Sequence, residues 1–231
     1  MKTNIYKFTT IGRIHSEMGV TNQDHITSYR DDNISILVVC DVAGGCRAGD
    51  TAALLVSDAL REFLYKNFEL LYNSEGWMIR KRISEMIDRL LDGFSAEHHD
   101  IPRKELGTTI MAAAMNHKKE ILTVHLGDGC IHFKRKDGSF GTVSHPQNEF
   151  YDRTYLTSGE VYPHLRVCRY DDPDLQMLLL ATDGVSDESL EQAEKVLEED
   201  CSVKAFFKVT NAIEASHPDD DATIAYIYVV D

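Results

Sequence analysis

The sequence lacks several features that would assign a protein to a class directly. Its 231 residues carry a formal net charge of −14, so the basic excess of nucleic-acid-binding proteins is missing and we expect no nucleic acid partner. The five cysteines are scattered and form no CxxC pair, which argues against a disulfide scaffold or a zinc ribbon and favours a reducing compartment. The ten histidines form no HxxH or HExxH pattern, so zinc chemistry has no support.

Long apolar runs are missing as well. No stretch approaches the length of a membrane span, and the opening MKTNIYKFTT lacks the apolar core of a signal peptide. We therefore expect a cytoplasmic protein that does not enter a membrane. No linker rich in proline, serine or glycine and no internal repeat divides the chain, so we expect one domain over residues 1–231.

Hydrophobic residues make up 43% of the sequence, and their spacing is typical of a protein with a large core. Residues 34–40, ISILVVC, are apolar on both faces, as in a buried strand. Apolar residues recur at helical spacing over 52–64 and 83–94, and Gly93 and Pro102 bracket the end of the second helix. Further strands are predicted at 26–29, 107–115, 120–126 and 222–230. CIHFKRKDG continues the middle hairpin into a turn at Asp137-Gly138, and LQMLLLATDG, 175–184, is a second apolar run that ends in Asp-Gly. Helices are predicted over SLEQAEKVLEE and VKAFFKVTNAIEA.

Hairpins dominate over βαβ units in this order. The order predicts an α+β fold, a layered sandwich rather than a doubly wound parallel sheet. Two residue groups look structural. We expect Trp77 to pack near the start of its helix, and we expect residues 134–138, KRKDG, to form a solvated hairpin tip.

Aspartates occur at the ends of the predicted strands: Asp24, Asp41, Asp128, Asp183 and the run Asp219–Asp221. Each alone is consistent with a turn, because aspartate caps turns and glycine permits positive φ. Asp41 and Asp183, however, each follow five or more apolar residues. Both should therefore lie close to the core, where a bare carboxylate is costly unless it is paired or binds a metal.

No matching set of lysines or arginines adjoins these positions. Carboxylates gathered without basic partners repel one another, and a hard divalent cation relieves that repulsion. Oxygen ligands select magnesium or manganese over zinc. A carboxylate shared by two such ions would give a two-metal site that activates water for in-line attack on phosphorus.

Six segments resemble, in order, the motifs of metal-dependent protein phosphatases of type 2C, the PPM family. They are TNQD, ILVVCDVAGG, LGTTIMAAAM, TVHLGDGCIHF, LLLATDGVSD and PDDDATIAYIYV. They resemble the family's N-E-D, D-G-x-G-G, G-[ST]-T, G-D-S-R, [ST]-D-G-[LV]-x-D and D-[ND]-x-T segments, and together they cover nearly the whole chain. The resemblance implies a four-layer α/β/β/α sandwich, with two antiparallel sheets face to face and helices outside.

The resemblance also implies roles for single residues. Asp41 matches the aspartate that bridges two metal ions, and the next residue, Val42, would offer its backbone carbonyl through water. Asp183 and Asp220 match further ligands of one ion, and Asp220 is chosen because it precedes Thr223 by three residues. The two remaining matches are Asp24, which would bind through water, and Asp128, the aspartate of a third, weaker metal site.

Three positions depart from the family pattern. Val42 stands where a glycine usually follows the bridging aspartate, so the turn must tolerate a Cβ. Ala43 stands where eukaryotic members often carry a histidine proposed as general acid. The leaving group must then be protonated in another way, for example by water. Gln23 replaces an early glutamate, which removes one negative charge.

The arginine that usually holds the phosphate is also missing, because Gly19 occupies its position. The opening GRIHSEMGVTNQD resembles a divergent bacterial subgroup in which a histidine takes part of that contact. His15 is therefore one candidate, and an ordinary surface or capping histidine is the alternative. Arg47 is a second candidate, unless it pairs with Asp50 at the start of the helix. Residues 148–158, NEFYDRTYLTS, resemble a segment of the same subgroup and could form a loop over the site.

The leading hypothesis is a protein serine/threonine phosphatase. Two Mg²⁺ or Mn²⁺ ions, with a third at the weaker site, would lower the pKa of a shared water that attacks the phosphorus without a phosphoenzyme. We expect a monomer that acts on a phosphorylated protein, with a cognate serine/threonine kinase.

Two alternatives stay open. The first is a pseudophosphatase, a metal-binding interaction module with little turnover, and the missing arginine, histidine and glutamate motivate it. The second is an aspartyl-phosphate hydrolase of the haloacid dehalogenase type, because VVCDV also resembles a strand with a nucleophilic aspartate. That family needs a second aspartate two residues on, where this chain has Ala43. A phosphoenzyme trapped on Asp41 would support it.

Overall fold

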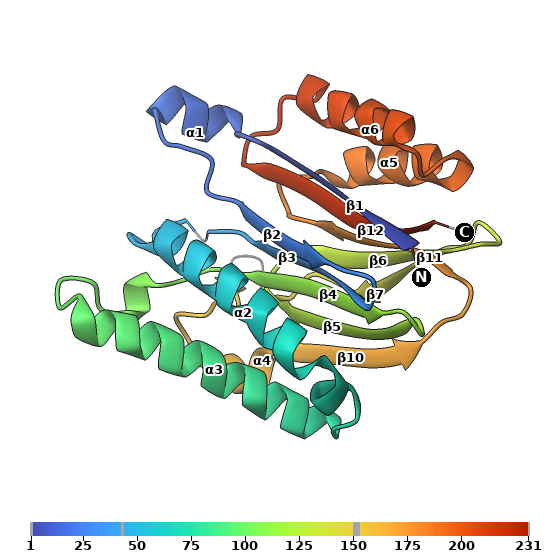
Figure 1. Cartoon of the computed structure of the whole chain (residues 1–231). Helices are drawn as coiled ribbons and strands as arrows, with labels where there is room; N and C mark the ends of the chain where they lie inside the picture. Colours follow the sequence, from blue (N-terminus) through green and yellow to red (C-terminus); the bar gives the residue numbers. More distant parts are fainter. Residues whose placement is uncertain (1, 43, 150–152, 231) are drawn as a thin grey trace.

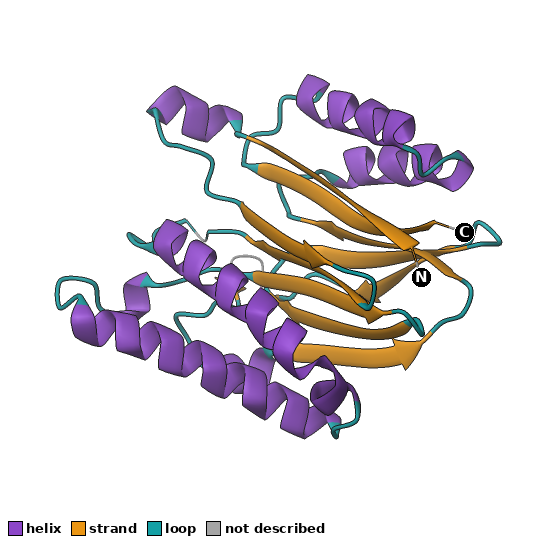
Figure 2. Cartoon of the chain, viewed as in Figure 1, coloured by secondary structure: helices purple, strands orange, loops and turns teal. Residues whose placement is uncertain are grey.

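Two five-stranded antiparallel sheets lie face to face in the computed structural model, and helices cover both outer faces (Figure 1, Figure 2). The structure describes residues 2–42, 44–149 and 153–230. Ala43 and residues 150–152, which belong to the segment 148–158, lie outside the described residues. The four layers confirm the predicted α/β/β/α sandwich.

Sheet one joins the two ends of the chain. Its strand order is β1 (Lys2–Thr10), β12 (Ala222–Val230), β11 (Leu175–Ala181), β6 (Cys130–Arg135) and β7 (Phe140–Ser144). β1 and β12 pair in full register, from Lys2 opposite Val230 to Thr10 opposite Ala222. The sequence does not predict β1, because its residue pattern can be recognised as a strand only when it pairs with β12, which is distant in sequence.

Sheet two carries the strand that precedes Asp41. Its order is β10 (Arg166–Asp171), β5 (Glu120–Leu126), β4 (Ile110–Asn116), β3 (Ile34–Cys40) and β2 (His25–Arg30). β3 is buried at every residue, as its two apolar faces predict. β10 lies at the edge of this sheet, and its partner among the described strands is β5.

The helices form the two outer layers. α2 (Gly49–Tyr72) and α3 (Gly76–Glu97) cover sheet two, whereas α5 (Asp187–Glu199) and α6 (Val203–Ala215) cover sheet one (Figure 1). The short elements are α1 (Arg13–Met18), η1 (Arg103–Glu105), β8 (Asn148–Glu149), β9 (Arg153–Thr154) and α4 (Val161–His164). α3 ends between Gly93 and Pro102, as predicted. In the described parts of the chain, no helix is both long and apolar enough to cross a bilayer.

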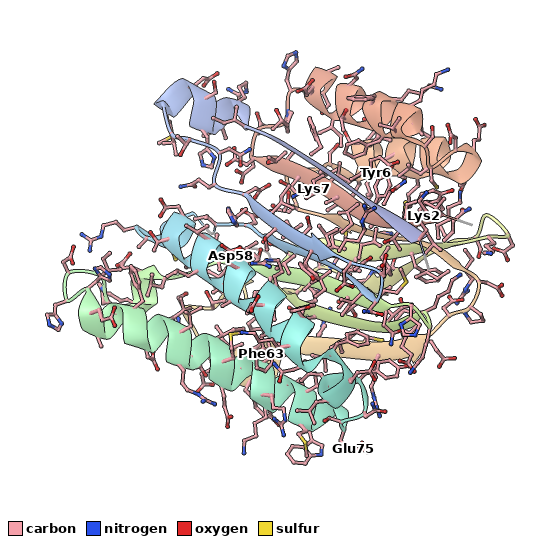
Figure 3. The ribbon with its side chains drawn as sticks, viewed as in Figure 1. Lys2, Tyr6, Lys7, Asp58, Phe63 and Glu75 are labelled. Carbon is pink, nitrogen blue, oxygen red and sulfur yellow. The ribbon has the colours of Figure 1, made fainter. Side chains whose placement is uncertain are left out.

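Three apolar layers hold the sandwich together. One lies between α2, α3 and sheet two, one between α5, α6 and sheet one, and the third between the sheets. β3 contributes side chains to two of these apolar layers. Ile36 and Val38 face the helices, whereas Leu37 and Val39 face sheet one. On the outer face of sheet one, the ring of Tyr6 lies 5.3 Å from that of Phe206 and 5.0 Å from that of Tyr226 (Figure 3).

Two expectations about structural residues are wrong. Trp77 is 51% exposed, because the buried face of α3 begins two residues later at Ile79. Lys134 is only 4% exposed and does not belong to the solvated hairpin tip. Its neighbour Phe133 points between the sheets, so Lys134 points to the opposite face of β6, toward α5.

Candidate active site

Three aspartates that follow strands of different sheets meet at one place. Asp41 follows β3 and Asp128 follows β5, both in sheet two, whereas Asp183 follows β11 in sheet one. One carboxylate oxygen from each lies within 4.8 Å of those from the other two. We call these three residues the aspartate cluster. The sequence predicted its members, and the folding of the two sheets brings them together.

The aspartate cluster lacks a counter-charge. Among the described residues, no ion pair joins any of its members to a lysine, arginine or histidine. Burial, together with the charges of Asp24 and Asp183, holds the pKa of Asp41 well above its usual range. Asp183 is more exposed, and partial burial with the charge of Asp128 raises its pKa to about 6.

Asp24 lies beside the cluster and is 9% exposed. Burial is the largest cause that raises its pKa, to about 7, and the charge of Asp221 acts in the same direction. Asp24 Oδ2 accepts a hydrogen bond from Thr182 Oγ1 at 3.1 Å, whereas its buried Oδ1 has no hydrogen-bond partner among the described residues. An orphaned carboxylate oxygen next to uncompensated aspartates fits a divalent cation, because oxygen-rich, anionic ligand sets bind Mg²⁺ and Mn²⁺.

Two threonines before β4 fix the backbone at Asp41. The Asp41 carbonyl accepts hydrogen bonds from Thr108 Oγ1 at 2.7 Å and from Thr109 N at 2.8 Å. The Asp41 amide donates to Thr109 Oγ1 at 3.0 Å. Asp128 is held by a hydrogen bond that Thr154 Oγ1 donates to its Oδ2. The G-T-T segment was noted in the sequence, but the contact made by Thr154 was not.

Val42 is accommodated by its surroundings. It forms an isolated antiparallel bridge with Thr108 and is 8% exposed. Its φ is not positive, so its Cβ causes no backbone strain. A Cβ built at Gly49 would lie 2.2 Å from Val42 Cγ1. The glycine that begins α2 therefore leaves room for the valine side chain.

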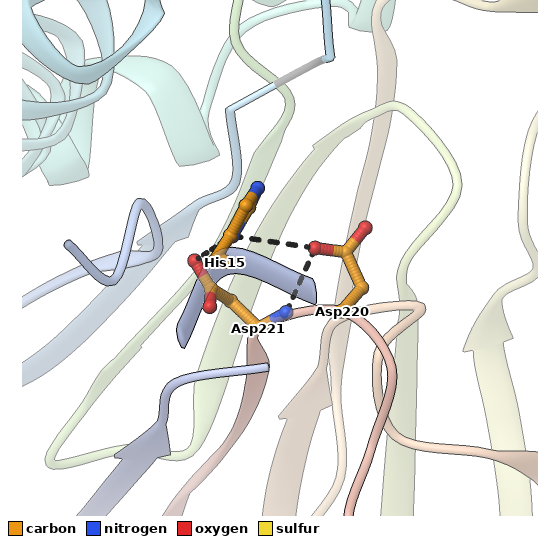
Figure 4. Close-up of side chains that lie close together, drawn as sticks. All are labelled: His15, Asp220 and Asp221. Atoms are coloured by element: carbon orange, nitrogen blue, oxygen red, sulfur yellow. Dashed lines mark hydrogen bonds and ion pairs between the residues drawn. The ribbon is translucent and has the colours of Figure 1, made fainter. Parts of the chain in front are cut away.

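A second cluster contains His15, Asp220 and Asp221 (Figure 4). His15 Nδ1 lies 2.9 Å from Asp221 Oδ2 and 3.8 Å from Asp220 Oδ1. The Asp221 side chain is 1% exposed and accepts hydrogen bonds from Gly12 N at 2.7 Å and Gln23 N at 2.6 Å. The sequence predicts no role for Asp221, because its burial against two backbone amides distant in sequence carries no local signal.

Asp220 differs from Asp221 in exposure. Its side chain is 61% exposed, and its Oδ1 accepts a hydrogen bond from Asp221 N at 2.8 Å. Its charge contributes to the raised pKa of Asp183, so it lies within electrostatic reach of the aspartate cluster without joining it. The structure thus groups Asp220 with His15, and the site consists of two adjoining acidic groups.

Arg47 contacts the segment that follows α3. Its guanidinium donates to the carbonyl of Asp100, and its amide donates to Glu105 Oε2 at 3.1 Å. Asp50 instead accepts from the amide of Thr51 at 2.7 Å. Arg47 therefore connects the loop before α2 to the segment after α3, and the alternative pairing with Asp50 is not formed.

The family model for protein phosphatase 2C matches residues 11–221, and no curated protein matches the sequence significantly. The serine/threonine phosphatase Stp1 from Staphylococcus aureus is similar, with a TM-score of 0.74 and 16% identity over 100% of this chain and 96% of that one. The S. agalactiae serine/threonine phosphatase has a TM-score of 0.73 and 20% identity over 99% and 100%.

RsbX in complex with magnesium is also similar, with a TM-score of 0.67 and 12% identity over 99% of this chain and 96% of that one. At such identities these likenesses establish the fold. The family match, in contrast, spans every aspartate of both clusters, and it displaces the haloacid dehalogenase interpretation. The chain belongs to the protein phosphatase 2C family.

Proposed function

We propose that this chain is a metal-dependent protein serine/threonine phosphatase. The observation that carries the proposal is the meeting of Asp41, Asp128 and Asp183 without a basic partner in the described parts of the chain. Carboxylates that raise one another's pKa values in this way need a counter-charge, and a divalent cation provides it. Membership of the protein phosphatase 2C family supports phosphoserine and phosphothreonine in proteins as substrates.

The residues fit two Mg²⁺ or Mn²⁺ ions, with a third, weaker site. Asp41 would be the ligand shared by two ions, and Asp183 and Asp220 would complete one of them. The remaining ligands would be Asp24 and the carbonyl of Val42, both through water, and Asp128 at the third site. When bound, such ions supply Lewis acidity toward the phosphate and lower the pKa of a water molecule.

His15 is our candidate for a phosphate contact. Asp221 is fixed by two backbone amides, and its Oδ2 lies 2.9 Å from His15 Nδ1, a charge contact without the geometry of a hydrogen bond. The other ring nitrogen points away from both aspartates (Figure 4) and is available to an incoming phosphate oxygen. Arg47 is the second candidate, and it would have to leave the carbonyl of Asp100 to reach a phosphate.

The second candidate function is a pseudophosphatase, a metal-binding interaction module with little turnover. The position of Asp220 favours it, because this side chain lies with His15 rather than within the aspartate cluster. For the enzyme the partner is a phosphorylated protein substrate. For the enzyme we further propose a cognate serine/threonine kinase, a cytoplasmic location and a monomeric, single-domain state.

Hydrolysis assays separate these two functions. Wild-type protein is incubated with an aryl phosphate and with a phosphothreonine peptide, in manganese, in magnesium and in chelator. We expect turnover that depends on the cation and falls by about a thousandfold or more in Asp41→Asn, equivalent to about 4 kcal/mol of transition-state stabilisation. Asp58→Asn is the matched control, because Asp58 is an exposed aspartate on α2 (Figure 3) that belongs to neither acidic cluster.

Two results would contradict the proposed phosphatase activity. Wild-type protein that is folded and binds manganese, yet hydrolyses neither substrate faster than Asp41→Asn, is a metal-binding module. Turnover that persists in chelator would contradict the metal-dependent chemistry itself.

A further inference from the structure

A groove of about 700 Å³ lies beside the edge strand β10. It is bordered by the first turn of α3, by α4, by β5 and β10, and by residues 143–147. None of the aspartates of the candidate active site lines it. Its size is that of pockets that hold small organic ligands, for which volumes of roughly 300–1,000 Å³ are usual.

The groove is basic although the protein has a net charge of −14. Arg80 and Arg166 line it, and the described residues of its lining include no carboxylate. Arg80 lies over the ring of Tyr162 at 5.6 Å, and Arg166 donates to the carbonyl of His145 at 2.8 Å. Each guanidinium has five N–H donors, so both keep donors for a ligand. Two guanidiniums with no acidic neighbour in the groove favour an anion.

His125 adds a polar atom without a partner to the lining. Its side chain is 1% exposed, and Nδ1 lies 2.6 Å from Ser144 Oγ. Its Nε2 is buried and has no hydrogen-bond partner in the described parts of the chain. Burial, together with the charge of Arg166, lowers its pKa to about 4, so the ring is neutral at pH 7. When Ser144 donates to Nδ1, Nε2 carries the hydrogen and can donate to a ligand.

Flat aromatic surface completes the groove. Trp77, the only tryptophan of the chain, is 51% exposed there. Tyr155 also lines the groove and stacks on His164 at 3.7 Å between ring centroids. Exposed large aromatics among hydrogen-bond donors are typical of ligand sites, since planar rings stack on them.

We propose that this groove binds a nucleoside phosphate, with its base against Trp77 and its phosphate oxygens at the guanidiniums of Arg80 and Arg166. The proposal does not depend on the phosphatase activity. The two sites are nonetheless connected, because Gln147 lines the groove and bonds to the segment that carries Asp128. Its Nε2 donates to the carbonyl of His164 at 2.8 Å, and its Oε1 accepts from the amide of Gly127 at 2.8 Å.

Fluorescence of Trp77 tests the proposal directly, because no other tryptophan contributes to the signal. The full chain is titrated with AMP and with GMP in the presence of chelator, which leaves metal-dependent phosphate binding out of the measurement. Adenosine serves as the uncharged control, and ribose 5-phosphate serves as the anion without a base. We expect a saturable change in emission with a nucleotide, and a much weaker response to both controls.

Variants locate the site. Arg80→Gln and Arg166→Gln should each weaken nucleotide binding about tenfold or more, the usual effect of losing a charge-assisted hydrogen bond. Arg82→Gln is the matched control, because Arg82 is an exposed arginine of the same helix outside the groove lining. Circular dichroism confirms that each variant is folded, and the two groove variants test the same contact independently.

Two outcomes would overturn the proposal. One is the absence of any emission change up to millimolar AMP and GMP. The other is a response that Arg80→Gln and Arg166→Gln leave unchanged. Loss of hydrolysis in a metal assay would not imitate either outcome, because the readout is the emission of Trp77 in chelator. Failure of the proposed phosphatase function is therefore distinguishable from failure of this site.

Discussion

Two regions of this protein hold buried charged side chains, and they differ in how those charges are matched. Beneath α5, Lys134 Nζ donates to the carbonyls of Leu197 at 2.6 Å and Glu198 at 2.9 Å, and lies 3.4 Å from Cys201 Sγ. At the ends of β3, β5 and β11, the aspartate cluster has no positive partner among the described residues. Lys134 has backbone acceptors for its donors within the chain, whereas the carboxylates of the aspartate cluster have no cation beside them among the described residues.

The pKa values show the same contrast. Burial alone would lower the pKa of His132, but hydrogen bonds with Cys130 and Glu194 outweigh it and raise the pKa to about 9. Glu194 Oε1 lies 2.9 Å from His132 Nδ1, so the charged form has its partner. For Asp41, burial and neighbouring carboxylates act in the same direction and oppose the charged form. The comparison teaches that charges satisfied within the chain support the fold, whereas charges left unsatisfied mark where a ligand is required.

Removing Lys134 disrupts the region beneath α5 and should have the largest effect. Lys134→Met keeps most of the apolar stem but leaves two carbonyls at the end of α5 without their donor. We expect the free energy of unfolding to fall by about 3 kcal/mol. Urea denaturation monitored by circular dichroism measures the change.

Lys195 provides the control on the same helix. It is exposed, so Lys195→Met should change the free energy of unfolding by less than about 0.5 kcal/mol. Equal effects of the two substitutions would show that the contacts of Lys134 do not stabilise the fold.

The pH dependence sharpens the comparison. In chelator, Asp24 and Asp183, with pKa values of about 7 and about 6, bind more protons in the folded state than in the unfolded chain. Stability should therefore rise as pH falls from 7 to 5, by about 2 kcal/mol net. The net figure is smaller than the gain from the two carboxyls, because the buried His125, with its pKa lowered to about 4, opposes part of it. His132 acts at higher pH, since its raised pKa gives stability that is lost as pH rises through about 9.

Urea denaturation at pH 5, 6 and 7 in chelator measures how the free energy of unfolding changes over this acidic range. Surface carboxylates with lowered pKa values, such as Asp31 and Asp137, act in the opposite direction but are exposed and contribute little. In Asp24→Asn the gain toward pH 5 should shrink. A wild-type protein that loses stability steadily from pH 7 to pH 5 would contradict the charge assignment.

The sequence predicts most of this fold because its elements carry strong local patterns. β3 is apolar on both faces, and the helical repeats of α2 and α3 are unbroken. β1, β7 and β10 were missed, and each is an edge strand that pairs along one side. For β1 and β10 the partner strand is also distant in sequence. Trp77 and Lys134 were misjudged for a related reason. Residue type suggested burial for Trp77 and exposure for Lys134, but the face on which each side chain lies decides its burial.

The site was predictable to a similar degree. Asp41, Asp128 and Asp183 were found from their position after strands, and the structure brings them together. The burial of Asp221 and the hydrogen bond from Thr154 to Asp128 were not predicted. Both depend on segments that meet only in the folded chain. The placement of Asp220 beside His15 is likewise a property of packing, which motif spacing cannot supply.

The central claim is that the aspartate cluster destabilises the folded chain until a divalent cation binds. The most direct test compares the stability of wild type and Asp41→Asn in chelator and in manganese. In chelator we predict that Asp41→Asn is the more stable by about 1 kcal/mol, because it removes an uncompensated buried charge. In manganese we predict the reverse order, because binding to the folded state stabilises the wild type. An Asp41→Asn protein that is less stable in chelator, with a wild type that manganese does not stabilise, would contradict the account.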